Sequence, residues 1–587
     1  MNSSVIGIDL GTTDSRIAIC RNGAFQVLPS IPSFIAFRGD LSEPLFGDEA
    51  KKQVSMNPLC TVYQINRLFG KRFLDFGVKK DMNLWPFRFY SSVLDDNEPP
   101  VVDVGFDGES KSFSSVQIIS FFLRNLKKIA EENFEIGGEE EYVDCVISVP
   151  SVFNDLQRRS LRYAAKLAGL NILRLLNETS AAAINYAVLK GIEQLDLNKL
   201  DDHQQLQKRQ RIDGEEKIMV FDLGGGSLSV AIIRVKEEDN VKKLIVKSQA
   251  GYTHLGGKDV DDLIILHCLN KFSEKNQGIF RHTFTELDRK KDSAKHLASS
   301  LSRLRLECER AKIALSSRGQ GEETIQVDSF HDTKNLVCTL SFNEFQYITR
   351  DLYTKCKTAT VQCIKDANLK DAYSVDKVIA LGRSTELPGI KHLLESMFSG
   401  IVKFQGTDAA VVRGAATQAS LLSGNGMIHR VTKNSVLDVI PVDIAIELAS
   451  GKKTLIKRNT TLPAQVDHLF TTSEEKQTTA VLRVYEKGWD QYYNFLGNFE
   501  ISKIPPAKKG WPKMKATLMI DRDGILGGTA FDSLDPSTRS PIPVAFPDPF
   551  AYTPGYRAYK CSVTIEKGNL STDDIEVLRQ RNSADMY

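Results

Sequence analysis

Apolar and polar residues follow the same order in two distant parts of the chain. Residues 4–10 form a short apolar run with Asp9 near its end, and a turn of small residues then leads into a segment typical of a β-hairpin. Residues 217–223 form a second apolar run with Asp222 near its end, followed by a glycine-rich turn and further predicted strands. Because the two aspartates lie 213 residues apart (222 minus 9), the pattern indicates an internal duplication.

Amphipathic helices are predicted after each copy of this unit. Residues 154–169 begin with Asn, end with Gly and carry apolar residues at helical spacing, and residues 299–315 show the same spacing. A third strand with a glycine at its end occupies residues 378–384, and the polar residues 191–214 are predicted to be a surface insertion. Strands that alternate with helices predict an α/β domain over residues 1–427.

The pattern changes near residue 437. Short alternating apolar runs separated by turns predict an all-β sandwich over residues 437–567, joined to the first domain by a linker at 428–436. Prolines and aromatic residues are frequent in residues 533–556, which are therefore predicted to form an irregular loop. A short helical stub and tail are predicted over residues 568–587.

Composition narrows the choice of partners and compartment. The 76 basic and 74 acidic residues nearly cancel, so the net charge of +2 gives no electrostatic reason to expect nucleic acid or a membrane surface as a partner. We find no run of about 18 apolar residues, and therefore expect no membrane span. The nine cysteines include no CxxC pair, which is typical of buried thiols in a reducing compartment. The cytoplasm is the expected location, with the nucleus as the alternative.

The two turns after the apolar runs have the composition of phosphate-binding loops. Gly11, Thr12 and Thr13 form the first turn, and Gly225, Gly226 and Ser227 belong to the second. Small residues let backbone N–H groups approach phosphate oxygens, and the hydroxyl groups add donors. Carboxylates at the strand ends can hold Mg²⁺ through water. One such turn is a weak signal, because turns after strands are often glycine-rich for steric reasons alone, but two matched turns predict a nucleotide site with a metal.

Several segments resemble the 70-kDa heat-shock (DnaK-type) chaperone family and occur in the same order as in that family. They are IGIDLGTTDS, GDEAKKQVSMNP, VISVPSVFND, AAKLAGLNILRLLNETSAAAINY, FDLGGGSLSV, THLGGKDVDD, ERAKIALSS and IKRNTTLP. The resemblance covers roughly residues 4–530 and is to the cytosolic branch. It implies an actin-like, two-lobed ATPase domain followed by a β-sandwich that binds extended apolar peptides. Beyond the predicted stub, we expect no counterpart of the helical lid of the family.

The resemblance also assigns site residues. Asp9 and Asp222 match the carboxylates associated with water-mediated Mg²⁺, and Glu178 matches the acidic residue associated with the attacking water. The expected ligands are ATP or ADP with Mg²⁺. The positions that match nucleotide-binding residues are Gly11, Thr12, Thr13, Gly225, Gly226, Ser227, Glu309, Lys312, Ser316, Gly382, Arg383 and Ser384. Ala480 and Leu482 match the lining of the peptide pocket, although Leu482 fits an ordinary sandwich core at least as well.

Several departures from the family pattern are at positions that the resemblance places near the phosphates of the nucleotide. Asn66 stands where the family has a lysine that contacts the terminal phosphate, and its loss is expected to slow phosphoryl transfer on the order of 10²–10³-fold. Asp14 replaces an aromatic or similar uncharged residue, which adds repulsion toward phosphate. Ser229 replaces an aspartate on the metal side, and Thr179 replaces a proline implicated in signalling between the domains.

Further departures affect the base pocket and the linker. Ile313 stands at an arginine of the family, and Arg383-Ser384-Thr385-Glu386 replaces Gly-Ser-Thr-Arg. Loss of guanidinium stacking on adenine weakens ATP binding by about 0.5–2 kcal/mol per contact, unless Arg383 stacks from its new position. The linker has lost its run of leucines, so we expect weaker docking and weaker coupling between the domains.

Three functions therefore compete. The first is an ATP-binding chaperone that binds unfolded polypeptide segments, with J-domain and nucleotide-exchange co-chaperones, or another chaperone, as candidate partners. The second is a non-cycling co-chaperone or regulatory scaffold with a vestigial nucleotide site, as Asn66, Ile313 and Glu386 suggest. The third, a sugar kinase on the same duplicated fold, would lack the β domain and is remote. An ATPase is expected from the resemblance, but Asn66 leaves the enzymatic activity open.

Overall fold

The structure is a computed structural model, and it divides into two compact units. Unit 1 comprises Met1–Phe153 and Ser160–Val436, and unit 2 comprises Asn154–Arg159 and Leu437–Tyr587. The structure describes residues 5–545 except 22, 40–43, 92–98, 107–108, 135–141, 198–214, 277–290, 332, 406–408, 425, 449, 489–492, 502–503 and 533–543.

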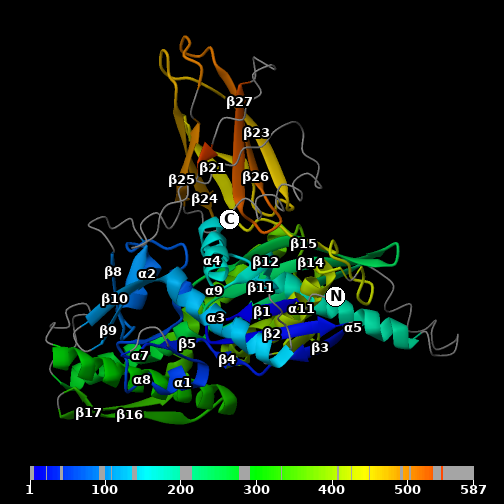
Figure 1. Ribbon diagram of the computed structural model, residues 1–587. Helices are drawn as coiled ribbons and strands as arrows, with labels where there is room; N and C mark the ends of the chain where they lie inside the picture. Colours follow the sequence, from blue (N-terminus) through cyan, green and yellow to red (C-terminus); the bar gives the residue numbers. More distant parts are fainter. Residues whose placement is uncertain are drawn as a thin grey trace. The chain divides into compact units, whose positions relative to one another are not determined.

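The first apolar run of the sequence lies within the first large sheet of unit 1. The strand order is β12-β11-β1-β2-β3, with β4 paired to β2. β1 runs parallel to β11 and antiparallel to β2, and its apolar side chains are buried (Figure 1). The strands are β1 (Ile6–Leu10), β2 (Asp14–Arg21), β3 (Ala24–Val27), β4 (Ile31–Pro32), β11 (Val143–Val149) and β12 (Leu170–Asn177).

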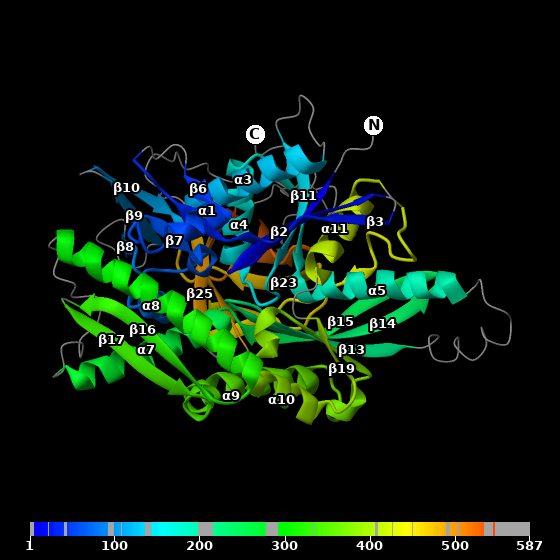
Figure 2. The same ribbon diagram turned by 90° about the horizontal axis from the view of Figure 1, so that it is seen from below.

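The second apolar run occupies the same place in a second sheet. Its strand order is β19-β18-β13-β14-β15-β20, in which β13 runs antiparallel to β14 and parallel to β18 (Figure 2). Both sheets therefore contain an antiparallel hairpin on one side of the repeated strand and parallel strands on the other, which confirms the predicted duplication. The strands are β13 (Glu216–Leu223), β14 (Leu228–Glu238), β15 (Val241–Tyr252), β18 (Lys377–Leu381), β19 (Val402–Gln405) and β20 (Val436–Leu437).

Helices follow both sheets, close to where their spacing predicts them. The predicted helix at 154–169 is observed as α4 (Asp155–Leu167), and the one at 299–315 lies within α8 (Lys291–Arg318). Helix α5 continues into the first residues of the predicted insertion at 191–214, as far as Leu197, and its buried alanines pack against α11. Residues 198–214 lie outside the described residues, so the insertion stays a prediction. The other long helices are α3 (Ser115–Phe134), α7 (Gly257–Lys275), α9 (Phe342–Asp366), α10 (Pro388–Met397) and α11 (Ala410–Leu422), and α5 spans Glu178–Leu197.

Smaller elements complete unit 1. Three small sheets have the orders β6-β5-β7, β10-β9-β8 and β16-β17. Their strands are β5 (Phe34–Ala36), β6 (Leu45–Phe46), β7 (Thr61–Tyr63), β8 (Arg88–Ser91), β9 (Pro100–Phe106), β10 (Glu109–Ser114), β16 (Glu322–His331) and β17 (Lys334–Ser341). Short helices are α1 (Gly47–Lys52), α2 (Phe76–Met82), η1 (Ile65–Leu68), η3 (Ala372–Ser374) and η4 (Arg383–Glu386).

The segment that the sequence assigns to the linker is hydrogen-bonded along an edge of unit 1. The amide of Lys242 donates to the carbonyl of Arg430 at 2.7 Å, and the amide of Leu244 donates to the carbonyl of Ser435, also at 2.7 Å. Ser435 and Val436 are buried. Backbone hydrogen bonds therefore hold this segment against β15 although its leucines are missing.

Unit 2 consists mainly of two antiparallel sheets. Their orders are β22-β21-β24-β25-β28 and β23-β26-β27, and one apolar cluster that includes Val484, Phe499 and Leu518 draws on both. The alternating pattern in the sequence predicts such a sandwich because each strand buries one face. The strands are β21 (Asp443–Leu448), β22 (Gly451–Ile456), β23 (Ala464–Thr471), β24 (Ala480–Lys487), β25 (Tyr493–Ile501), β26 (Lys513–Ile520), β27 (Leu526–Asp532) and β28 (Val544–Ala545).

The predicted irregular loop at 533–556 is wrong at one point. Val544 and Ala545 form β28, which pairs with Glu500 and Ile501 of β25. These two residues lie between prolines, and pairing at a sheet edge uses only the residues that keep an amide. The rest of that loop and the predicted stub at 568–587 lie outside the described residues.

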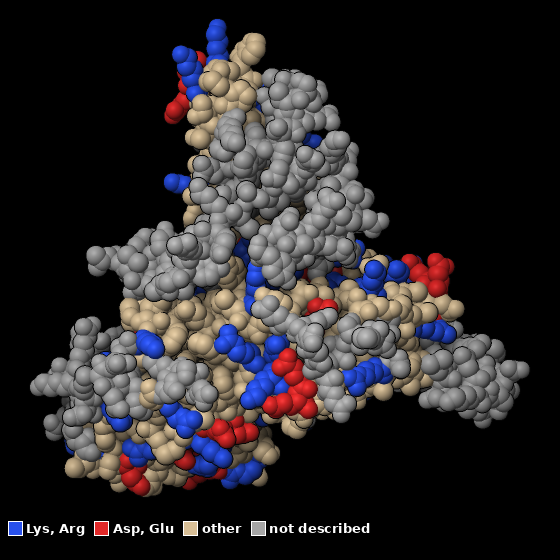
Figure 3. Space-filling model, in the orientation of Figure 1, with Lys and Arg blue, Asp and Glu red and all other residues tan. Residues whose placement is uncertain are grey.

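Basic and acidic side chains are interspersed on the face shown in Figure 3. This distribution agrees with the nearly balanced charge of the chain. Among the residues that the structure describes, no helix combines the length and apolar character needed to cross a bilayer.

Candidate functional site

The two predicted phosphate loops lie against each other in unit 1. A Cβ atom added to Gly225 would lie 2.0 Å from Thr13 Oγ1, and one added to Gly226 would lie 2.5 Å from Thr12 Oγ1. The loops can approach this closely because neither glycine has a side chain. The structure therefore brings together two turns that are more than 200 residues apart in the sequence.

Three carboxylates lie beside these loops. Asp9 is in β1 and Asp222 is in β13, each next to the turn that follows its strand, and Glu178 is the first residue of α5. Burial, then the charges of Asp222 and Asp9, raise the pKa of Glu178 well above its usual value. Burial and the charge of Asp9 raise the pKa of Asp222 to about 7. Burial also raises the pKa of Asp9, although a hydrogen bond from Ser148 opposes the rise.

This cluster fits a divalent cation held through water. A nearby positive charge would stabilise all three ionised carboxylates, whose mutual repulsion otherwise favours the protonated forms. Among the described residues, no three His, Cys, Asp or Glu side chains are arranged to ligate a metal directly. Mg²⁺ prefers to keep several of its waters, so an indirect site is compatible with this geometry. Ser229, buried on β14, hydrogen-bonds to Glu178 and partly offsets the rise in its pKa.

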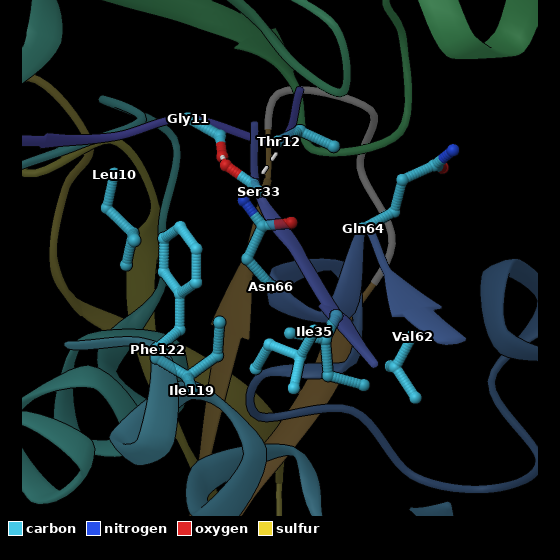
Figure 4. Close-up of a pocket in the computed structure, with 11 residues that line it drawn as sticks. Leu10, Gly11, Thr12, Ser33, Ile35, Val62, Gln64, Asn66, Ile119 and Phe122 are labelled. Carbon is cyan, nitrogen blue, oxygen red and sulfur yellow. Dashed lines mark hydrogen bonds between the residues drawn. The ribbon is translucent and has the colours of Figure 1, made fainter. Parts of the chain in front are cut away.

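Asn66 contacts the first phosphate loop through its amide. Its Nδ2 donates to Thr12 Oγ1 at 3.1 Å, while its Oδ1 is buried and has no hydrogen-bond partner in the described part of the chain. Ser33 Oγ supports the same loop by donating to the carbonyl of Gly11 at 2.7 Å. Figure 4 shows these residues at a small pocket, whose other lining residues are Leu10, Ile35, Val62, Gln64, Ile65, Ile119 and Phe122. Asn66 thus lies against the first predicted phosphate loop and brings no charge to it.

Asp14 and Arg383 form an ion pair across the site. Arg383 Nη2 lies 2.5 Å from Asp14 Oδ2, which links the start of β2 to η4. The sequence predicts repulsion between Asp14 and phosphate, and a contact between Arg383 and the nucleoside. The structure instead places the two departures from the family pattern against each other.

The residues predicted to surround the nucleoside lie on α8 and on the third glycine turn. Ser384 Oγ donates to the carbonyl of Gly224 at 2.8 Å, which ties this turn to the second phosphate loop. Gly382 has a φ of +81°, a conformation that favours glycine, and a Cβ there would meet the carbonyl oxygen of Leu223 at 2.2 Å. Ser316 Oγ is buried without a hydrogen-bond partner among the described residues, so it remains available to a ligand.

Sequence reasoning missed two residues of α7 in this region. Lys258 Nζ lies 2.7 Å from Glu309, and Asp261 lies 2.7 Å from Lys312 Nζ. Burial opposes ionisation of Glu309, but the charges of Lys258 and Lys312 outweigh it and lower its pKa to about 2. Lys258 follows a glycine pair in the segment THLGGKDVDD, and this position is the signal that could have identified it. Ile313, at the altered base position, is 59% exposed.

A second buried ion pair also escaped the sequence analysis. Arg67 Nη2 lies 2.6 Å from Asp259, and Arg67 Nη1 lies 3.4 Å from Asp81. Arg67 is the residue next to Asn66, and its guanidinium is buried with these carboxylates. The charge beside Asn66 is therefore engaged away from the phosphate loop.

In unit 2, the predicted peptide-pocket residues lie on β24. Ala480 and Leu482 are half-buried and pack against the apolar cluster of the sandwich, whereas Val481 between them is 55% exposed. This position is compatible with either a pocket wall or the edge of the core, so their role in peptide binding stays a prediction.

The arrangement as a whole is that of a two-domain protein, with an α/β domain followed by a β-rich domain. A family model described as Hsp70 protein matches residues 5–545, and the chain belongs to the Hsp70 family. It is 34% identical over 581 residues to a heat shock 70 kDa protein of Emericella nidulans, an alignment that covers 97% of this chain and 79% of the relative.

Other relatives agree with this assignment. Heat shock cognate 70 kDa protein 3 of Dictyostelium discoideum is 34% identical over 581 residues, which cover 97% of this chain and 81% of the relative. A ribosome-associated molecular chaperone of Eremothecium gossypii is 35% identical over 540 residues, which cover 90% of this chain and 80% of the relative. The resemblance predicted from the sequence motifs is thereby confirmed.

Proposed function

We propose that this chain is an ATP-binding chaperone that binds extended apolar segments of unfolded polypeptides and hydrolyses ATP slowly. The observation that carries the proposal is the cluster of Asp9, Glu178 and Asp222 beside two facing phosphate loops. Buried carboxylates that repel one another are stabilised by a cation, and Mg²⁺ bound to a nucleotide supplies one.

The residues of the chain have separate tasks in this proposal. Backbone amides of the two glycine turns and the hydroxyls of Thr12, Thr13 and Ser227 donate to phosphate oxygens. Asp9 and Asp222 would hold the waters of a bound Mg²⁺. Glu178, in its ionised form, accepts a hydrogen bond from the attacking water and orients it. When bound, Mg²⁺ would supply positive charge against the charge that develops on the phosphates.

Slow hydrolysis follows from the absence of charge at Asn66. Its amide donates to Thr12, and the neighbouring Arg67 is paired with Asp259 and Asp81. Without a cation from this side, stabilisation of the transition state is reduced on the order of 10²–10³-fold in rate. Weakened coupling between the domains, expected from the linker sequence and Thr179, belongs to the same proposal.

The β-rich domain supplies the peptide site in this proposal. Ala480 and Leu482 are the proposed lining residues, and the small side chain of Ala480 leaves a wide pocket with fast exchange. J-domain and nucleotide-exchange co-chaperones are the proposed protein partners, and the cytoplasm is the proposed location.

A non-cycling co-chaperone is the second candidate. It is favoured by two contacts that satisfy site residues without a ligand, Asn66 to Thr12 and Lys258 to Glu309. In that case the α/β domain is a scaffold for protein partners. The family assignment gives no support to the third candidate, a sugar kinase.

Calorimetry with Mg-ATP, followed by single-turnover hydrolysis on the same protein, tests the proposal. We expect binding with slow hydrolysis, and a gain of at least about tenfold in hydrolysis rate for Asn66→Lys. Asn171→Lys, which adds the same charge at an exposed position of β12, is the matched control. Release of a fluorescent apolar peptide on addition of ATP tests the chaperone function itself. No binding at millimolar ATP leaves the scaffold function as the better explanation.

A further inference from the structure

The Asp14–Arg383 ion pair joins two elements that carry phosphate-site residues. Asp14 follows Thr13 of the first phosphate loop directly, and Arg383 follows Gly382 of the third glycine turn. Their closest side-chain atoms are 2.5 Å apart although the residues are separated by 369 positions. The side chain of Asp14 is 16% exposed and that of Arg383 is 58% exposed. The guanidinium is therefore anchored at the phosphate loop while much of it faces solvent.

Three other cations near the site, Lys258, Lys312 and Arg67, are already engaged by buried or half-buried carboxylates. Lys258 lies between Glu309 and Asp261, and Lys312 is paired with Asp261 as well. Arg67 is buried with Asp259 and Asp81. Releasing any of these cations to a ligand would leave an unpaired charge in a poorly solvated place, which is costly. Arg383 differs, because solvent already reaches its guanidinium.

The negative charge at the loops also needs a cation. Asp9, Asp14, Glu178 and Asp222 surround the place where the sequence predicts phosphates, and Asn66 contributes no charge. Mg²⁺ offsets part of this repulsion, whereas the carboxylate of Asp14 is paired with Arg383. An anion that binds next to Asp14 is therefore repelled unless Arg383 approaches it.

We propose that Arg383 is the phosphate-binding cation of this chain, supplied from the third glycine turn in place of a lysine at position 66. Asp14 holds the guanidinium beside the loop until a nucleotide binds. The five N–H donors of a guanidinium allow it to contact phosphate oxygens in a bidentate manner while it shares or gives up its bond to Asp14. This inference rests on the proposed nucleotide binding, and it makes Arg383 the residue that selects nucleoside di- and triphosphates over nucleosides.

A purely structural role for the pair makes a different prediction. If the pair only holds the two elements together, removal of either charge has the same effect on every ligand. If Arg383 binds phosphate, removal of the Asp14 charge frees the guanidinium and lowers the repulsion, so the two substitutions act in opposite directions. The sign of the effect therefore distinguishes the two roles.

The test is calorimetry of the full chain with Mg-ATP, Mg-ADP and adenosine. For Arg383→Gln we expect affinity for both phosphorylated ligands to fall about tenfold, with adenosine unchanged. For Arg383→Lys we expect an intermediate loss, because the charge remains but the fork of donors does not. For Asp14→Asn we expect tighter binding of ATP, by about threefold or more. Arg350→Gln, at an exposed arginine of α9 paired with Asp351, is the control and leaves all affinities unchanged.

Each outcome decides something. Unchanged ATP affinity in Arg383→Gln overturns this inference and leaves the proposed function intact. Equal weakening by Arg383→Gln and Asp14→Asn, extending to adenosine, assigns the pair to structure and also overturns it. No binding by the unsubstituted chain overturns both proposals. Equal thermal unfolding temperatures of the variants, measured by circular dichroism, exclude misfolding as the cause of a loss.

Discussion

Neutralising Asp222 should make unit 1 more stable at neutral pH. Burial and the charge of Asp9 raise the pKa of Asp222 from 3.8 to about 7, so the folded chain holds this proton more tightly than the unfolded chain does. A raised carboxyl pKa destabilises the fold once the unfolded chain has lost the proton, and the penalty grows until the folded chain loses it too. Stability is therefore lost as the pH rises from about 4 to about 7.

The size of the penalty follows from the two pKa values. A shift of roughly three units, at about 1.36 kcal/mol per unit, corresponds to about 4 kcal/mol at pH 7 and above. Asp222→Asn is uncharged at every pH and close in shape to the protonated acid. The free energy of unfolding of the variant should therefore exceed that of the original chain by up to about 4 kcal/mol at pH 8, and by less than half as much at pH 5.

Urea denaturation at pH 5, 6, 7 and 8 without Mg²⁺ or nucleotide measures this difference. Fluorescence of Trp85, which is buried in unit 1, reports the relevant transition. Asp351→Asn, at a side chain that is 87% exposed, is the control and should give a difference that does not change with pH. Addition of Mg-ADP should stabilise the original chain more than Asp222→Asn, because the variant lacks a carboxylate for the metal. A difference that stays constant between pH 5 and pH 8 would refute the reasoning.

Three further substitutions test other parts of the structure. Gly225→Ala places a methyl group 2.0 Å from Thr13 Oγ1 and should weaken ATP binding, measured by calorimetry, at least about tenfold, on the scale of a lost charged hydrogen bond. Gly426→Ala, which has open space around it, should leave ATP binding unchanged. Equal affinities of the two variants would show that the loops separate freely. Lys258→Gln leaves Lys312 as the neighbouring cation of Glu309 and should lower the free energy of unfolding of unit 1, measured in urea, by about 1–3 kcal/mol. No loss would mean that Lys312 alone is enough to stabilise the charge of Glu309. Phe499→Ala leaves a cavity in the core of unit 2 and should lower the free energy of unfolding of that unit by about 3–5 kcal/mol. Val481→Ala, on the exposed face of β24, should lower it little.

The repeated strand units could be predicted because their signal is local. An apolar run such as residues 217–223, followed by a glycine turn and a hairpin, specifies a buried strand from its own side chains. The same holds for β21 and β24, whose alternation predicts one buried face. A polar segment is less well defined by its pattern, since α5 continues to Leu197 although the sequence becomes polar from residue 191 onward.

The contacts that distinguish this site could not be predicted in the same way. Asp14 and Arg383 were each identified as departures, but their meeting depends on how two sheets are packed together, and no spacing in the sequence encodes it. The same is true of Lys258 with Glu309 and of Arg67 with Asp259. Residue types at a site follow from motifs, whereas their pairing follows from tertiary structure.

The charges of the site favour nucleotide binding over a purely structural role for the α/β domain. Asp9, Glu178 and Asp222 all have raised pKa values, so each makes the fold less stable at neutral pH. Replacing any of them by a neutral residue would make a scaffold more stable. A purely structural role does not require three carboxylates that repel one another. Such a cluster is expected where a cation binds. Asn66 differs from these carboxylates, since it carries no charge and its amide donates to Thr12, and the missing charge is expected to lower the rate of phosphoryl transfer. A site that keeps its destabilising carboxylates and lacks the charge at position 66 is best explained by a domain that binds Mg-ATP and hydrolyses it slowly.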